Sequence, residues 1–119
     1  MPEVGRAEVE GWIGAAERLV CCRIGFTEVF RAVMLQVAVD SGAVLARLDR
    51  DWSRVVVVDV DDTLARSAGR LAVAHHLRSL DALHLAAAES IHDEQLRLAT
   101  FDDRMRRAAL ALGIPVLPE

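Results

Sequence analysis

Short apolar runs alternate along the chain with longer stretches in which apolar residues recur every three or four positions. The runs are too brief for helices and are typical of strands buried in a parallel sheet. They occupy residues 19–24, 55–60, 96–101 and 114–117. The periodic stretches predict helices over 2–18, 26–37, 43–48, 63–75 and 104–112. Strands that alternate with helices in this way predict an α/β fold, in which a mainly parallel central sheet is flanked by helices.

Small and polar residues mark the boundaries between these elements. We expect Gly25 to end the first strand and Thr27 to cap the helix that follows it. Ser41–Gly42 interrupts the helical pattern, and the next helix is expected to end before Trp52. Gly113 is expected to stop the last helix.

The stretch 79–90, SLDALHLAAAES, is apolar on nearly every side. Such a helix is normally buried, so the rest of the domain is expected to pack around it. Ser79 is placed to cap the helix, and Asp81 then lies in its first turn, where the helix dipole favours an ionised carboxylate. Asp81 either supplements the cap or belongs to a site.

Three separate segments can deliver carboxylates to one edge of the predicted sheet. Glu28 begins the helix after one strand, Asp102 and Asp103 follow another, and Asp81 opens the central helix. Ligands of open parallel sheets bind beyond the carboxyl ends of the strands. Clustered carboxylates repel one another unless a cation neutralises them, and Mg²⁺ and Mn²⁺ prefer oxygen ligands. The pattern therefore predicts a divalent-metal site at this edge.

Length and composition set limits on the class of protein. A chain of 119 residues forms one domain, and 53% hydrophobic with 4% aromatic residues predicts a core of alanine, valine and leucine. Cys21 and Cys22 are adjacent and do not form an ordinary disulfide, which fits a reducing cytoplasm. The sequence contains no apolar run of the length that a membrane span requires, so no membrane partner is expected.

The charge of the chain argues against wholesale capture of nucleic acid. The formal net charge is −4, whereas that mode of binding needs a basic surface that releases counterions from phosphates. Local patches remain open: all 14 basic residues are arginine, which suits bidentate phosphate contacts. Arg104, Arg106 and Arg107 can contact phosphate near Asp102 or form a charged helix face.

The three acidic segments resemble the PIN-domain family, in particular the VapC-type toxins of bacterial toxin–antitoxin pairs. The matching stretches are FTEVFRA with Glu28, LRSLDALHLAAA with Asp81, and LATFDDRM with Asp102, followed by a helix and GIPV. The resemblance implies a three-layer PIN-like fold and a Mg²⁺-dependent endoribonuclease, in which these carboxylates hold the metal and are catalytic. It implies RNA as the substrate, a cognate antitoxin protein as a partner, and a homodimer as a candidate assembly.

The start of the chain departs from the family pattern. The family begins with an apolar strand that ends in a metal-binding aspartate, whereas Met1 is followed here by PEVGRAEVE, which resembles the segment after that strand. We therefore expect a single PIN-like domain over 1–119 with its first strand missing. The strands Leu19–Ile24 and Leu96–Phe101 would then have unpaired edges, and the toxin would be impaired or inactive. A non-catalytic interaction module, a decayed toxin, is the alternative function.

A second motif, VVVVDVDDTLA at 55–65, resembles the first motif of haloacid-dehalogenase-like phosphatases, with Asp59 as nucleophile and Asp61 as acid/base. That chemistry also needs a cationic side chain, usually lysine, and the sequence has none. We expect the acidic cluster to be a solvated turn and a helix cap, with the phosphatase as a distant alternative. The adjacent His75 and His76 are expected at a helix end near solvent, and His84 is expected to be a hydrogen-bonded core histidine.

Overall fold

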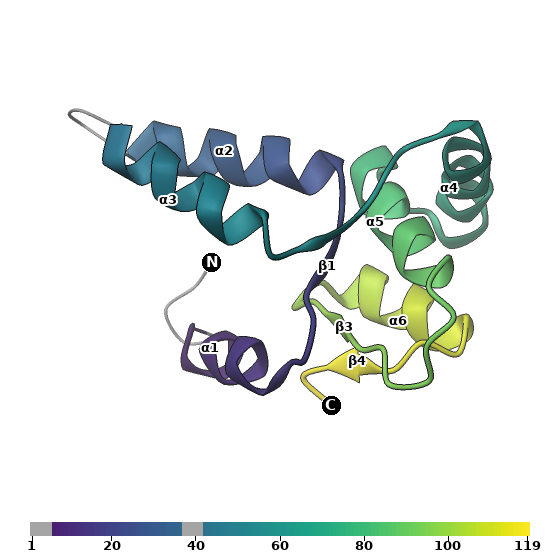
Figure 1. Cartoon of the computed structure of the whole chain (residues 1–119). Coiled ribbons are helices and arrows are strands. Elements are labelled where there is room, and N and C mark those ends of the chain that lie inside the picture. Colours follow the sequence, from purple (N-terminus) through teal and green to yellow (C-terminus); the bar gives the residue numbers. More distant parts are fainter. Residues whose placement is uncertain (1–5, 37–41) are drawn as a thin grey trace.

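Helices and strands alternate in the computed structural model, which describes residues 6–36 and 42–119 (Figure 1). The elements of these ranges are α1 (Arg6–Ala15), β1 (Val20–Cys22), α2 (Ile24–Gln36), α3 (Gly42–Trp52), β2 (Val56–Val58), α4 (Asp62–His75), α5 (Ser79–Glu89), β3 (Leu98–Ala99), α6 (Asp103–Ala111) and β4 (Val116–Leu117). The α/β class predicted from the hydrophobic pattern is confirmed. Every predicted element has a counterpart, and each strand is shorter than its apolar run.

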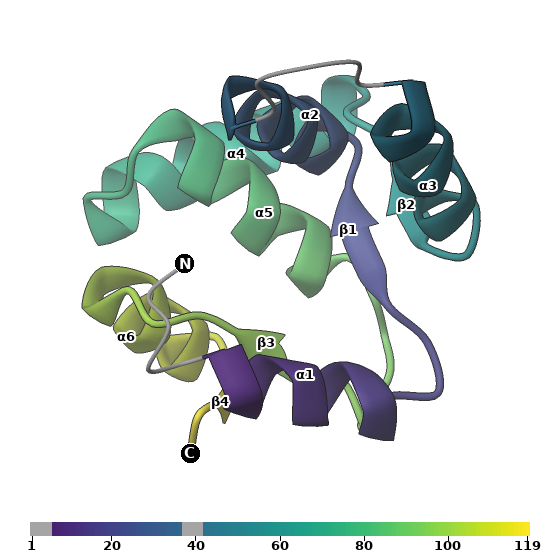
Figure 2. The same ribbon diagram turned by 90° about the vertical axis from the view of Figure 1, so that its left-hand side faces the viewer.

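The strands form two separate parallel pairs. β1 pairs with β2, with Val20 opposite Val56, and β3 pairs with β4, with Leu98 opposite Val116. Within residues 6–36 and 42–119 no strand joins the two pairs (Figure 2), so the predicted parallel sheet is present in two pieces. Within these ranges each of the four strands pairs on one side only, so the prediction that β1 and β3 flank a missing strand stays a prediction.

The core lies around α5, between α4, α6 and β1. Alanine and leucine supply most of it, as the composition predicts, and Leu85, Ala82 and Ala109 have no exposed surface. The buried hydrophobic residues are Cys22, Leu64, Ala68, Leu71, Leu77, Ala82, Leu85, Ala86, Ala87, Met105, Ala108, Ala109, Ile114 and Val116. The prediction that the chain packs around residues 79–90 is confirmed, because α5 contributes four of these side chains: Ala82, Leu85, Ala86 and Ala87.

The roles predicted for Gly25 and Thr27 at the start of α2 are wrong. Gly25 does not end the strand: α2 already begins at Ile24, and Gly25 is buried inside it. A glycine suits this close approach, since a Cβ there would lie 3.6 Å from the His84 ring and 3.7 Å from the Trp52 ring. Thr27 therefore lies within α2 and does not cap it.

The start of α5 and the end of α3 also differ from expectation. Ser79 is the first residue of α5, and the N-cap is Arg78, which makes no side-chain capping bond. α3 continues through Trp52. Trp52 packs edge-on against Phe26, with 5.3 Å between ring centroids, and this tertiary contact gives the end of α3 a partner that the local sequence does not show.

Several sequence expectations fall on residues outside the described ranges. They are the start of the first helix at residues 2–5, the apolar position Val37 and the Ser41 part of the Ser41–Gly42 break. No helix within the described ranges is both long and apolar enough to cross a bilayer.

Both cysteines are free, as predicted. Burial, followed by the neighbouring Cys22, raises the pKa of the Cys21 thiol. The reactive thiolate of Cys21 is therefore scarce at neutral pH.

Candidate functional site

Among the predicted site residues, Asp81 has the fewest side-chain bonding partners in the described ranges. It lies in the first turn of α5 and is partly buried. Its side chain makes no hydrogen bond or ion pair with any residue in the described ranges. Both of its oxygens are therefore available to a cation.

Glu28 is held against α5 by a histidine. Its Oε1 lies 2.5 Å from Nε2 of His84, a contact that joins α2 to α5. His84 is therefore hydrogen-bonded, as predicted. Its side chain is 28% exposed and that of Glu28 is 44% exposed, so the contact lies at the edge of the core. Asp81 and His84 are three positions apart on one helix and therefore share a face. The contact thus brings Glu28 to the face of α5 that carries Asp81.

Asp102 caps α6. Its Oδ1 accepts a hydrogen bond from the backbone N–H of Met105 at 3.0 Å, and its own N–H donates to Oγ1 of Thr100 at 3.1 Å. Nη1 of Arg104 donates to the carbonyl oxygen of His76 at 3.3 Å. This last bond ties the first turn of α6 to the connection between α4 and α5, so the helix starts that carry Asp81 and Asp102 lie on the same side of the molecule.

The carboxylates of Glu28, Asp81 and Asp102 are the kind of ligand that a divalent metal takes, but the described residues do not form a complete set of ligands. Carboxylate oxygens are the ligands that Mg²⁺ and Mn²⁺ take. Over residues 6–36 and 42–119, however, no group of three histidine, cysteine, aspartate or glutamate side chains is placed to hold a metal ion. Glu28 is bonded to His84, and Asp102 to the backbone of α6. Metal binding by Glu28, Asp81 and Asp102 stays a prediction.

The acidic residues of the phosphatase-like motif have structural partners. Oδ1 of Asp61 accepts from the backbone N–H of Leu64 at 2.8 Å and caps α4, so its predicted role as a helix cap is confirmed. Asp59 forms an ion pair with Arg23, at 2.6 Å from Nε to Oδ1. This ion pair was not predicted from the sequence. The signal for it was present, because Arg23 directly follows β1, Asp59 directly follows β2, and these two strands pair with each other.

The Arg23–Asp59 pair should make a small, acid-sensitive contribution to stability. The hydrogen bond from Arg23 lowers the pKa of Asp59 below 3.8. Since the folded-state pKa is the lower one, the stabilisation is present above the ordinary carboxyl pKa and is lost as the pH falls through the folded-state pKa. Asp59→Asn should therefore lower the urea midpoint slightly at about pH 7 and by less at about pH 3. An equal difference at both pH values would contradict this assignment.

Comparisons with known proteins give a consistent family. The family model described as PIN domain matches residues 2–110. The chain is 40% identical over 78 residues to Ribonuclease VapC45 of Mycobacterium tuberculosis (strain CDC 1551 / Oshkosh). The aligned region covers 62% of this chain and 54% of that protein. Ribonuclease VapC49 of strain ATCC 25618 / H37Rv gives the same identity and coverage, 40% over 78 residues, 62% and 54%.

Ribonuclease VapC46 of Mycobacterium tuberculosis (strain ATCC 25618 / H37Rv) is 41% identical over 73 residues, which are 44% of this chain and 56% of that protein. The chain spans about half the length of these curated relatives. No solved structure matches it. Because the family model covers nearly the whole sequence, the chain belongs to the PIN domain family.

Proposed function

We propose that this chain acts as a VapC-like endoribonuclease toxin of a toxin–antitoxin pair and that its activity depends on Mg²⁺ or Mn²⁺. The observation that carries the proposal is Asp81, an uncommitted carboxylate at the start of the helix around which the core is built. The similarity to proteins named Ribonuclease VapC supports the same reading.

The residues of the chain have separate tasks in this proposal. Asp81 would hold the cation through its free carboxylate, with Asp102 offering the oxygen that does not cap α6. His84 would orient the Glu28 carboxylate over the same face of α5. A bound divalent ion supplies charge neutralisation and a nucleophile at neutral pH. RNA is the proposed substrate, a cognate antitoxin the proposed partner, and the cytoplasm the proposed location; a homodimer stays a candidate assembly.

A non-catalytic interaction module is the second candidate function. One observation favours it: the part of the chain seen in the structure does not bring three metal donors together. Losing one ligand of a small metal site removes most of the affinity when the others cannot complete the coordination. For this reason we expect cleavage by the isolated chain to be slow.

Cleavage of a labelled structured RNA tests the proposal. The chain should cut the RNA slowly in Mg²⁺ or Mn²⁺, stop in EDTA, and resume when excess Mg²⁺ is added, because only a metal-dependent reaction follows this order. Cleavage that persists in EDTA would contradict the proposed chemistry. RNA left intact under every condition would favour the interaction module.

A further inference from the structure

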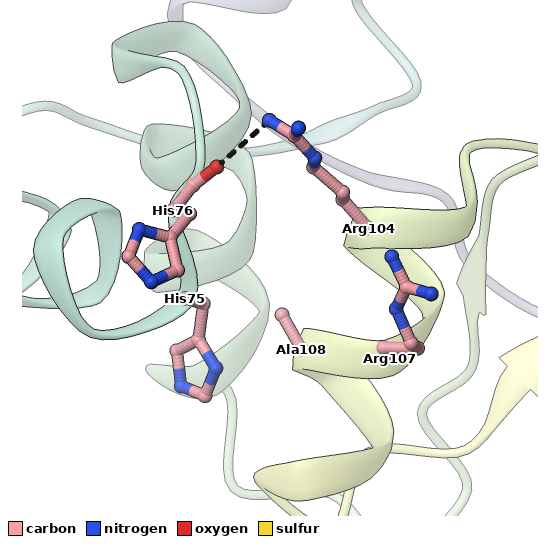
Figure 3. Close-up of a pocket in the computed structure, with 5 residues that line it drawn as sticks. All are labelled: His75, His76, Arg104, Arg107 and Ala108. Atoms are coloured by element: carbon pink, nitrogen blue, oxygen red, sulfur yellow. Dashed lines mark hydrogen bonds between the residues drawn. The ribbon is translucent and has the colours of Figure 1, made fainter.

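A pocket of about 370 Å³ lies between the end of α4 and the first turns of α6. We call it the basic pocket, and it is lined by His75, His76, Arg104, Arg107 and Ala108 (Figure 3). The two histidines reach it from the end of α4 and the two arginines from α6, so the polar side chains stand on opposite walls. Its volume lies at the small end of the range of about 300–1,000 Å³ that is typical of ligand pockets.

The charged side chains that line the basic pocket are suited to an anion. Among the described residues, none that lines it carries a carboxylate. Neither Arg104 nor Arg107 forms an ion pair with a residue in the described ranges. The side chain of the neighbouring Arg106 does not line the pocket. Its Nη1 donates to the carbonyl oxygen of Thr100 at 3.3 Å. Two guanidinium groups without an ion-pair partner in the described ranges are therefore gathered at one place, on a chain whose formal net charge is −4. Arg104 uses one N–H on the carbonyl oxygen of His76, and Arg107 forms no side-chain hydrogen bond within these ranges.

The backbone keeps the two walls in place. His76 is the C-cap of α4 and has φ of 55°, a left-handed conformation that is uncommon for residues other than glycine. Its N–H donates to the carbonyl oxygen of Ala72, and its own carbonyl oxygen accepts from Arg104. Ala108 is buried and is part of the core. The pocket thus combines a fixed apolar floor with basic side chains above it.

The basic pocket is next to both candidate site helices. α5 begins at Ser79, three positions after His76, and Asp102 caps α6 two positions before Arg104. A chain of phosphates that reached Asp81 and Asp102 would therefore pass the arginines. Guanidinium groups form bidentate hydrogen bonds with phosphate oxygens, whose geometry they match.

We propose that the basic pocket binds a backbone phosphate of single-stranded RNA beside the bond to be cut. The identity of the polymer rests on the proposed function, whereas the preference for a phosphate rests on the pocket itself. An acidic protein segment is the competing ligand.

Binding without cleavage tests this proposal. Fluorescence anisotropy would follow a short fluorescein-labelled oligouridylate in EDTA, where metal-dependent cutting is absent. Arg104→Gln with Arg107→Gln should weaken binding about tenfold. It should also lower the slope of log affinity against log salt by about 0.7, because the loss of one phosphate contact on a single strand means that fewer counterions are released when the RNA binds. Arg107→Gln alone should give part of this loss, and it removes no side-chain hydrogen bond to residues 6–36 or 42–119.

Arg50→Gln is the matched control, because it removes the same charge from α3, which lies at the other end of the molecule (Figure 1). It should leave affinity and salt slope nearly unchanged. Equal losses in the control and in Arg107→Gln would overturn the proposal, as would displacement of the RNA by polyglutamate as readily as by unlabelled oligouridylate. Failure of the ribonuclease proposal would look different: RNA would still bind through the arginines but would not be cut in Mg²⁺.

Discussion

Asparagine in place of Asp81 should lower the rate of metal-dependent RNA cleavage by about 100-fold or more. The change is nearly isosteric and removes the charge that would hold the cation. Since the side chain of Asp81 forms no hydrogen bond or ion pair with a residue in the described ranges, the substitution should cost the fold little stability. The initial rate of cleavage of a labelled RNA in Mg²⁺ measures the effect, and calorimetric titration with Mn²⁺ measures the loss of metal binding separately.

Asp61→Asn is a matched control for this experiment. The same chemical change is made at a carboxylate that caps α4, and asparagine caps helices about as well as aspartate. The control should therefore keep both cleavage and Mn²⁺ binding. If Asp61→Asn lost them while Asp81→Asn did not, the metal would belong to the other acidic cluster. If neither variant changed the cleavage rate, the cleavage would come from a contaminating nuclease.

The hydrophobic pattern predicted the order and type of the elements because it depends on local periodicity. α5 stands at the centre of the fold because its apolar residues cover the helix on nearly every side, which the sequence alone shows. The start of α2 could not be predicted in the same way. Gly25 is usually read as a break, but it lies inside the helix where His84 and Trp52 approach from distant parts of the chain.

The candidate site also has features that the sequence could predict and features that depend on tertiary packing. Glu28, Asp81 and Asp102 could be selected from the sequence because the pattern predicts each of them after a strand or at the start of a helix. For Glu28 this predicted position is wrong, since α2 begins at Ile24 and Glu28 is its fifth residue. What each carboxylate bonds to depends on packing: only the structure shows that His84 holds Glu28 while Asp81 is left uncommitted. The basic pocket depends on tertiary structure too, since it forms only when α6 lies against the end of α4.

Leu85→Ala should lower the free energy of unfolding by about 2–5 kcal/mol, because it leaves a cavity at a fully buried position. Leu85 has 0% exposure and is among the largest fully buried side chains of the core, where the many alanines give little volume to fill the gap. A domain of this size has a total stability of about 5–15 kcal/mol, so a loss of this size is a large fraction of it. Urea unfolding measures the change as a lower midpoint at an unchanged slope.

Leu80→Ala makes the same change in the same helix at a side chain that is 45% exposed. It should cost less than about 1 kcal/mol, since it removes less buried surface and opens no enclosed cavity. Leu85→Met nearly conserves volume and should cost less than about 1.5 kcal/mol, so it keeps the test informative if Leu85→Ala does not fold. Equal costs for Leu80→Ala and Leu85→Ala would mean that α5 does not turn Leu85 into the core, and the face that carries Asp81 and His84 would then have to be reassigned as well.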